Sequence, residues 1–343
     1  MMKLIVVMMT VLTLAFTLRA EETKVRPVDR DLALDPSTAV VDYKIQGEYT
    51  GDVTGADGTK SKLGAQIIAL GGGTFHSVFL PGGLPGDGWD AKTRIENAGH
   101  WQADGKTDGD KTAFEPAAGK TGYTATISGE TLSGKTDKGE SFELKKVMRQ
   151  SPTLGAKPPE GATVIFDGSS LDELKGGQID DRKFLTTVHG NAYTKKEFVD
   201  YTLHVEYMEP FKPYGRDQDR GNSGVYQQNR YEVQVLDSFG LKGLNNEAGG
   251  IYSKVAPKIN MAFPPLSWQT YDIEFTAAKF ENGKKVKNAL ITLKHNGVIV
   301  HENQEIDGPT GGGQPETEKG GPIQFQGHGN PVFFRNLWIV EKK

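Results

Sequence analysis

Short runs of alternating apolar and polar residues, separated by glycine-rich turns, fill the chain between residues 43 and 148. Alternation with a period of two is typical of strands that bury one face. Turn-type sequences such as Gly71-Gly72-Gly73 punctuate the runs, and no helical period of useful length occurs. The pattern predicts a small antiparallel β-meander or barrel over residues 43–150. Its clearest strand candidates are residues 65–70, 74–80, 123–127 and 141–144.

The same strand pattern returns after a proline-rich stretch at residues 151–161, which we interpret as a linker because paired prolines stiffen a chain and cannot enter a central strand. No helical segment separates the later runs, so residues 162–343 are predicted to form a two-sheet antiparallel sandwich. The fold class is therefore all-β, in two units. The strand candidates of the second unit are residues 163–166, 201–207, 231–236, 271–275, 289–293 and 332–339.

Composition narrows the functional classes. The 43 glycines among 343 residues exceed the roughly 7% that is usual and agree with many tight turns. The formal net charge of −4 gives no basic face, so no nucleic-acid partner is expected. The absence of cysteine from the sequence excludes disulfides, thiolate catalysis and cysteine-based zinc sites.

The first 20 residues have the pattern of a secretory signal peptide. Lys3 precedes an apolar run at residues 4–18, and Ala20 precedes a charged stretch. The apolar run is shorter than the ~20 residues that a membrane span needs, although an uncleaved N-terminal anchor is the alternative. Residues 21–42 follow as a leader segment with little periodicity. We expect an exported protein, periplasmic or extracellular, without stable membrane insertion.

A series of short sequence words occurs in order through the second unit. Together they resemble the 3-keto-disaccharide hydrolase family over about residues 160–341. The resemblance implies a concanavalin A-like jelly roll, which agrees with the sandwich predicted from the strand pattern. The words are IFDGSSL (165–171), GNSGVY (221–226), YEVQVLDS (231–238), WQTYDI (268–273), HNGV (295–298), GPIQFQ (321–326), HGNPV (328–332) and FRNLW (334–338).

One word departs from the family pattern. The family often has Gln-Asp-His-Gly-Asn-Pro, whereas here Gln326 is followed by Gly327 and then His328. If the acidic residue orients the histidine in relatives, that support is missing from this chain.

The word at residues 231–238 carries the clearest candidate chemistry. On a strand Glu232 and Gln234 share one face, opposite Val233 and Val235. Ordinary glycoside hydrolysis uses two carboxyl groups, ~5–5.5 Å apart for retention or ~6.5–9.5 Å apart for inversion. This strand supplies one, and Asp237 would add a second only if a bulge or turn rotated it inward.

The resemblance implies a 3-keto sugar as the substrate. Cleavage of such a sugar needs fewer catalytic carboxyl groups than ordinary glycoside hydrolysis. Its carbonyl acidifies the proton on C2, so one base can remove that proton while the aglycone leaves C1. Glu232 is the candidate base and His328 the candidate acid, with Gln234 and Gln326 as oriented amides. Alternatively Glu232 only hydrogen-bonds a sugar hydroxyl or a neighbouring strand, and His328 only caps a backbone group in its turn.

Further residues could bind the sugar or serve the fold. Asn222 could contact sugar hydroxyls or form an Asx turn. Tyr226 and Trp268 could offer a platform for a sugar ring or belong to the core. Arg335 could clamp a carbonyl or pair with a carboxylate of the core, and we favour the pairing.

The sequence holds no evident cofactor motif. It lacks a Gly-x-Gly-x-x-Gly after a strand and a His-Glu-x-x-His pair. Asp217, Asp219 and Asn222 are spaced like weak calcium ligands but lack a twelve-residue loop ending in glutamate. A divalent metal in the sugar site is left open. A 3-keto substrate would require a separate sugar 3-oxidoreductase as functional partner.

Two functional hypotheses follow. The first is an exported hydrolase that cleaves 3-keto-glycosides or disaccharides by elimination and hydration. The second is a non-catalytic carbohydrate-binding module on the same sandwich. They differ in whether an ionisable group is essential, because binding alone should tolerate Glu232→Gln.

Overall fold

The structure, a computed structural model, describes residues 29–90, 102–108, 111–116 and 122–342. The predicted signal peptide, residues 1–20, lies outside these residues, as does the first part of the predicted leader. Among the described residues, no helix has the length and apolar character needed to cross a membrane.

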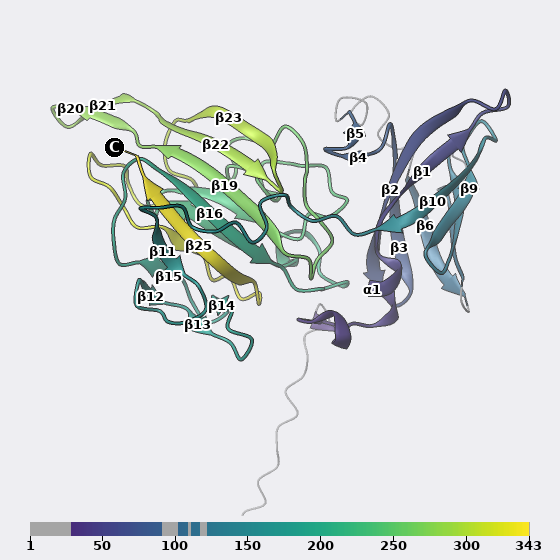
Figure 1. Ribbon diagram of the computed structural model, residues 1–343, viewed down its shortest axis with the longest axis horizontal. Helices are drawn as coiled ribbons and strands as arrows, with labels where there is room; N and C mark the ends of the chain where they lie inside the picture. Colours follow the sequence, from purple (N-terminus) through teal and green to yellow (C-terminus); the bar gives the residue numbers. More distant parts are fainter. Residues whose placement is uncertain (1–28, 91–101, 109–110, 117–121, 343) are drawn as a thin grey trace, which may run out of the picture.

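The first unit is a closed antiparallel barrel, drawn in purple to teal in Figure 1. Its strands follow the order β1-β10-β9-β8-β7-β6-β3-β2, so the first and last strands of the meander pair and close it. The strands are β1 (Gly47–Thr54), β2 (Lys60–Gly71), β3 (Thr74–Pro81), β6 (Gln102–Asp108), β7 (Lys111–Glu115), β8 (Thr124–Ser128), β9 (Thr131–Lys135) and β10 (Ser141–Val147).

Aromatic side chains fill the barrel. The ring of Phe79 lies 5.0 Å from that of Tyr123 and 5.6 Å from that of Phe142, between centroids. In β10, Phe142 and Leu144 point inward while the residues beside them are exposed or half-buried, as the period of two requires. The barrel interior is therefore a packed core.

The second unit is a sandwich of two antiparallel sheets. The larger has the order β13-β14-β25-β16-β19-β22-β23, with β11 also paired to β25, and the smaller has the order β12-β15-β24-β17-β18. The larger sheet contains β11 (Thr163–Phe166), β13 (Gln178–Ile179), β14 (Leu185–Thr186), β16 (Tyr201–Met208), β19 (Gln269–Thr276), β22 (Ala289–His295), β23 (Val298–Ile306) and β25 (Phe333–Glu341). The smaller contains β12 (Leu174–Gly176), β15 (Ala192–Thr194), β17 (Ser223–Gln227), β18 (Tyr231–Val235) and β24 (Gln324–Phe325).

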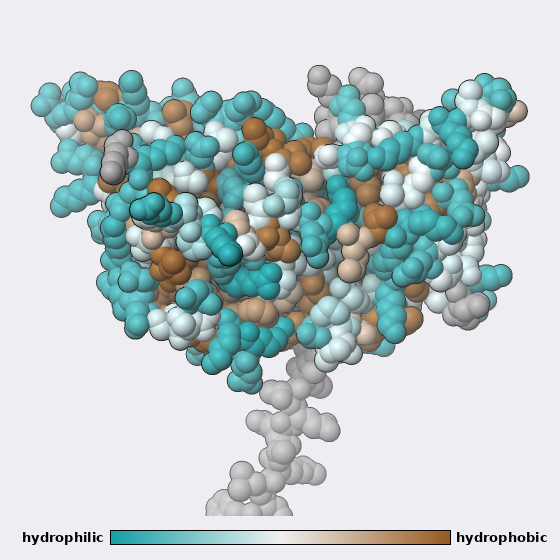
Figure 2. Space-filling view, viewed as in Figure 1, coloured by the Kyte–Doolittle hydropathy of each residue, from teal (hydrophilic) through white to brown (hydrophobic). Residues whose placement is uncertain are grey.

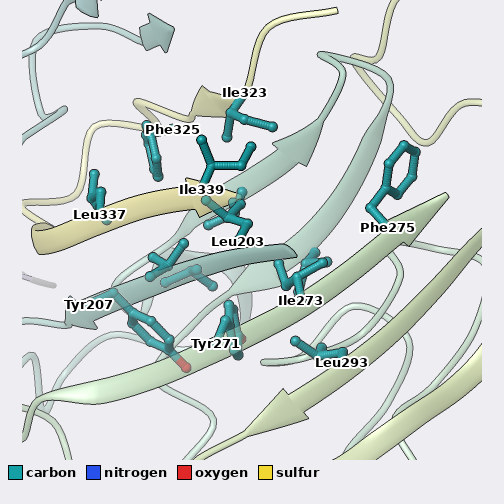
Figure 3. Close-up of a cluster of buried hydrophobic side chains, with 14 of the residues drawn as sticks. Leu203, Tyr207, Tyr271, Ile273, Phe275, Leu293, Ile323, Phe325, Leu337 and Ile339 are labelled. Atoms are coloured by element: carbon teal, nitrogen blue, oxygen red, sulfur yellow. The ribbon is translucent and has the colours of Figure 1, made fainter. Parts of the chain in front are cut away.

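The sandwich core lies between the two sheets. Leu203, Ile273 and Ile339 from the larger sheet gather with Phe325 from the smaller one, all fully buried (Figure 3). The prediction of an all-β chain with a jelly-roll-type sandwich behind a small β unit is confirmed, and each strand candidate of the sequence overlaps an observed strand.

Short elements complete the fold. The β4 (Leu84–Pro85) and β5 (Gly88–Trp89) pair follows β3, and β20 (Lys279–Glu281) with β21 (Lys284–Lys287) forms a hairpin beyond β19. The predicted leader contains a 3-10 turn, η2 (Pro36–Thr38), and the helix α1 (Val41–Ile45) begins at its end and runs into the range predicted for the first unit.

The predicted linker is attached to the sandwich over its first half. Thr153 donates its hydroxyl hydrogen to Asp272 over 2.7 Å, and the backbone N–H of Gly155 donates to Glu206 over 2.6 Å. Both carboxylates lie on the larger sheet. Only residues 157–161 are exposed throughout, so the free part of this connection is shorter than the proline pattern indicates.

The two units share apolar contacts. Phe239 of the sandwich packs with Ile68 and Leu80 of the barrel, and Phe211 and Leu266 belong to the same cluster as the barrel core. The face drawn in Figure 2 is mainly hydrophilic, with scattered apolar groups, some of them where the units meet. The barrel therefore lies directly against the loops at one end of the sandwich.

Candidate functional site

A pocket of about 260 Å³ lies on the face of the smaller sheet that is turned away from the core. Val225 and Val233 are buried in the core, so strand alternation projects Tyr226 and Glu232 onto the opposite face. Its lining residues are Gln218, Asn222, Tyr226, Glu232, Gln234, Tyr252, Gly311, Gly312, Gln326 and His328.

Glu232 has room for its carboxyl because a glycine stands beside it. Gly224 lies opposite Gln234 on the neighbouring strand, and a Cβ there would come within 2.2 Å of Glu232 Oε1. Any larger residue at position 224 would displace the carboxyl group. The last glycine of the GNSG segment is therefore required for the close approach of the Glu232 carboxyl group.

Tyr226 binds Glu232 directly. Its hydroxyl donates to Glu232 Oε2 over 2.9 Å, with the carbonyl oxygen of Gly311 as a second acceptor at 2.8 Å. The Gln326 amide donates to the same hydroxyl oxygen over 3.2 Å. Tyr226 is buried, which favours the packed position over the sugar platform, the two roles that the sequence left open, and its hydroxyl orients Glu232.

Burial sets the protonation of Glu232. Only 3% of the residue is exposed, and this desolvation raises the pKa of Glu232 to about 7, against the lowering effect of the Tyr226 hydrogen bond. A carboxyl group with a pKa near neutrality can accept a proton and return it at the same pH. Among the described pocket residues Glu232 is the only carboxylic acid.

The Gln234 amide lies between Glu232 and Gln218. One end of the amide lies 3.0 Å from Glu232 Oε1, and the other end lies 2.8 Å from Gln218 Oε1. With nitrogen toward Glu232, the amide donates to the carboxylate. With nitrogen toward Gln218, the amide oxygen accepts the proton of a neutral Glu232. The two orientations suit the two protonation states.

A loop between β16 and β17 forms one wall of the pocket. Gln218 comes from the 3-10 turn η3 (Asp217–Asp219), and its amide donates to the Asn246 carbonyl over 2.8 Å. Asn222 donates to Gln218 Oε1 over 3.3 Å. The wall therefore presents amide groups, which suit the hydroxyls of a sugar.

Gly327 stands where the family often has an acidic residue, and its surroundings leave no space for a side chain. A Cβ at Gly327 would lie 2.2 Å from the Thr187 carbonyl oxygen and 2.7 Å from Gly190. The backbone N–H of Gly327 is bound by Asn191 Oδ1 over 2.8 Å. An acidic side chain does not fit in this conformation. His328, the next residue, is exposed and lines the pocket opening.

The sequence profile of a family described as "3-keto-alpha-glucoside-1,2-lyase-like domain" matches residues 161–340, more than half of the chain. The chain belongs to this family. The match covers the sandwich and every residue of the pocket and leaves out the barrel.

One solved structure agrees with this membership. The chain is 34% identical to a candidate glycosyl hydrolase from Parabacteroides distasonis ATCC 8503, with a TM-score of 0.50 over 54% of this chain and 85% of that one. Two others from the same organism, also named as candidate glycosyl hydrolases, are 18% and 22% identical, with TM-scores of 0.40 and 0.39, over 54% and 53% of this chain and 95% and 99% of theirs. A comparison with curated proteins gave no match. The chain is thus a glycosyl hydrolase-like, carbohydrate-active protein.

Asp237 and Arg335, which the sequence offered as sugar-binding residues, lie outside the pocket, and Arg335 makes the carboxylate pair that the sequence favoured. Asp237 lies two residues beyond the end of β18 and is buried in an ion pair with Arg220, at 2.8 Å. Arg335 pairs with Glu206 over 2.7 Å on the larger sheet. Its guanidinium carbon lies 4.0 Å from the centroid of the Trp268 ring. Neither Arg335 nor Trp268 lines the pocket.

Other pocket residues were missed by sequence reasoning. Gln218, Tyr252, Gly311 and Gly312 come from loops that only the fold brings to β18. The nearest sequence clue was the calcium-like spacing of Asp217, Asp219 and Asn222, which lacks the twelve-residue loop of a calcium site. In the described part of the chain no group of three or more His, Cys, Asp or Glu side chains is arranged to hold a metal.

Proposed function

We propose that this protein cleaves 3-keto-glycosides by elimination followed by hydration, with net hydrolysis. The observation that carries the proposal is the single buried carboxyl group of Glu232, whose pKa burial raises to about 7, in a pocket otherwise lined by amides and tyrosines. The 3-keto substrate class is taken from the description of the family.

The pocket lining argues against ordinary glycoside hydrolysis. That reaction uses an acid and a nucleophile or base, usually two carboxyl groups ~5–9.5 Å apart. The described lining offers one. A substrate whose C2 proton is already acidified by a neighbouring carbonyl needs only one strong base.

In the elimination step Glu232 takes the proton from C2, and the C2 electron pair forms the C1=C2 double bond as the C1–O bond breaks. His328 gives a proton to the departing aglycone oxygen. The amides of Gln234 and Gln326 stabilise negative charge that develops on the C3 oxygen. Water then adds its oxygen to C1 and a hydrogen to C2, which yields the free 3-keto sugar.

The size of the pocket fits this substrate class. At about 260 Å³ it lies just below the ~300–1,000 Å³ of typical small-molecule sites, which suits one sugar ring with the aglycone toward solvent. The proposal includes export of the protein, on the N-terminal pattern, and a sugar 3-oxidoreductase that supplies the ketone.

The deciding experiment is incubation of the purified protein with a 3-keto-disaccharide and with the unmodified disaccharide. We expect aglycone release from the keto sugar only. Glu232→Gln should reduce turnover by about 10²–10⁴-fold, the usual contribution of a general base, while the substrate still binds. Glu302→Gln, which changes an exposed carboxylate on β23, is the matched control and should leave turnover unchanged.

Deuterium at C2 should slow the wild-type reaction if proton removal limits the rate. Binding of both sugars without release of either aglycone would favour the carbohydrate-binding module instead. Undiminished turnover in Glu232→Gln would refute the assignment of the base.

A further inference from the structure

The pocket wall that carries Gln218 and Asn222 is in contact with the barrel. The loop of residues 212–222 leaves β16, meets the turn between β2 and β3, and returns to the pocket at η3. The barrel itself contributes no residue to the pocket lining described above. The barrel therefore reaches the pocket only indirectly, through this loop.

Two residues of the loop touch the turn. Arg216 donates from Nη2 to the carbonyl oxygen of Leu70 over 3.0 Å. The ring of Tyr214 lies against Gly71 and Gly72, with the guanidinium of Arg30 5.3 Å from the ring centroid. Arg216 is separated from Gln218 by one residue, so an anchor at Leu70 limits where Gln218 can lie.

The turn needs glycine at the contact. Gly71 has a φ of +91°, and a Cβ there would come within 2.6–2.7 Å of three atoms of the Tyr214 ring. The ring is rigid, so it can relieve this contact only by moving as a whole. Gly73 has a comparable φ of +71°, but a Cβ there would meet only Thr107, at an ordinary 3.6 Å. The tight fit is thus specific to the position under Tyr214.

The loop transmits the contact because it is internally tied. Arg216 donates from Nη1 to the carbonyls of Pro213 and Gly215, at 2.6 and 2.7 Å. The N–H of Asp219 donates to the Arg216 carbonyl over 3.0 Å. Lys212, only 1% exposed, bonds Asp219 at 3.0 Å. A displacement of Tyr214 or Arg216 therefore moves η3.

We propose that the turn between β2 and β3 is a positioning element for the pocket: through Tyr214 and Arg216 it sets the place of the Gln218–Asn222 wall and hence the affinity for substrate. This gives the barrel a role in the site of the sandwich. The identity of the substrate rests on the proposed function, whereas the placement of the wall does not.

The test compares Gly71→Ala with Gly73→Ala in the full chain. Both substitutions put a side chain at a left-handed position and carry similar backbone strain, but only the first collides with Tyr214. Hydrogen–deuterium exchange of residues 214–222 should increase in Gly71→Ala and stay at the wild-type level in Gly73→Ala. With a 3-keto-disaccharide, Gly71→Ala should raise KM about five- to tenfold, the loss typical of a neutral hydrogen bond.

The value of kcat and its pH profile should change little in Gly71→Ala, because Glu232 lies on β18 and not on the loop. A global loss of structure would instead lower kcat and raise exchange throughout the chain. Tyr214→Ala provides the coupling test. In that background the difference between Gly71→Ala and Gly73→Ala should disappear, since the ring that the new methyl group meets is gone.

Equal exchange and equal KM in the two glycine variants would overturn the positioning role. If the wild type releases no aglycone from 3-keto sugars while exchange of residues 214–222 still separates the variants, the proposed function fails and the positioning role stands. The two ideas are thus tested by different readouts.

Discussion

Tyr226 and Glu232 face each other across the β17–β18 pair, and the tyrosine hydroxyl donates to the carboxylate over 2.9 Å. The same hydroxyl lies 2.8 Å from the Gly311 carbonyl. One hydroxyl hydrogen serves one acceptor at a time. Tyr226 can therefore donate to Glu232 when that group is ionised and to Gly311 when Glu232 carries the proton. The Tyr226 hydroxyl thus has a suitable acceptor in both protonation states of Glu232.

Tyr226→Phe should move the pH dependence of the reaction to higher pH. The hydrogen bond lowers the pKa of Glu232 against the effect of burial, so its removal raises this pKa above about 7. A base is active when deprotonated, and the rising limb of kcat/KM should shift upward by about one pH unit. Activity at pH 6.5 should fall about tenfold and recover near pH 9.

The control is Tyr252→Phe, which removes another hydroxyl from the same pocket and keeps the bond between Tyr226 and Glu232. The rising limb of the pH profile of kcat/KM should not shift in this variant. An unshifted limb in Tyr226→Phe would mean that Glu232 is not the titrating base.

Gly224→Ala should abolish most activity without unfolding the protein. The added methyl group would lie 2.2 Å from Glu232 Oε1 and 2.9 Å from its carboxyl carbon, so the carboxyl must swing away from the site. Turnover should fall at least about 100-fold, in the range expected for loss of a general base. Gly308→Ala, where a Cβ has no neighbour within 4 Å, should retain full turnover. Steady-state kinetics with circular dichroism checks both.

Strand alternation was enough to place the centre of the site. It put Glu232 and Gln234 on one face and Val233 with Val235 in the core, and the structure has this arrangement. Alternation is a local property of the backbone, so the sequence carries it directly. The barrel and the sandwich followed from the same period of two.

Contacts between distant segments could not be predicted in this way. Asp237 is withdrawn from the pocket by Arg220, which lies on the loop before β17. Gln218 reaches the pocket only because its loop folds back against the barrel. Such pairings depend on tertiary packing, which no spacing within the chain encodes.

Limited proteolysis should cut near Glu160 without separating the two units. Residues 157–161 are exposed, so a glutamate-specific protease can reach this bond, while Thr153 and Gly155 remain attached to the larger sheet. Because Phe239 packs against Ile68, the nicked halves should co-elute in size-exclusion chromatography until denaturant is added. Separate elution under native conditions would instead indicate two independent domains.

Glu232→Gln should stabilise the protein above neutral pH. Burial raises the pKa of Glu232 to about 7, against roughly 4.3 in an unfolded chain. The folded state therefore binds this proton more tightly than the unfolded state does. Below about pH 4.3 Glu232 is protonated in both states, and the free energy of unfolding has its full value. The contribution of the protonated group is lost as pH rises through about 7, where a charge must be buried. The full difference amounts to about 4 kcal/mol. The amide variant carries no such charge, so its free energy of unfolding should exceed that of the wild type by a margin that grows between pH 5 and pH 8.

Urea unfolding at both pH values measures the margin, and Glu302→Gln, on an exposed carboxylate, should show none. Parallel pH dependence of Glu232→Gln and the wild type would mean that Glu232 is already ionised at pH 5, and a base with a pKa near neutrality would then have to be sought elsewhere in the pocket.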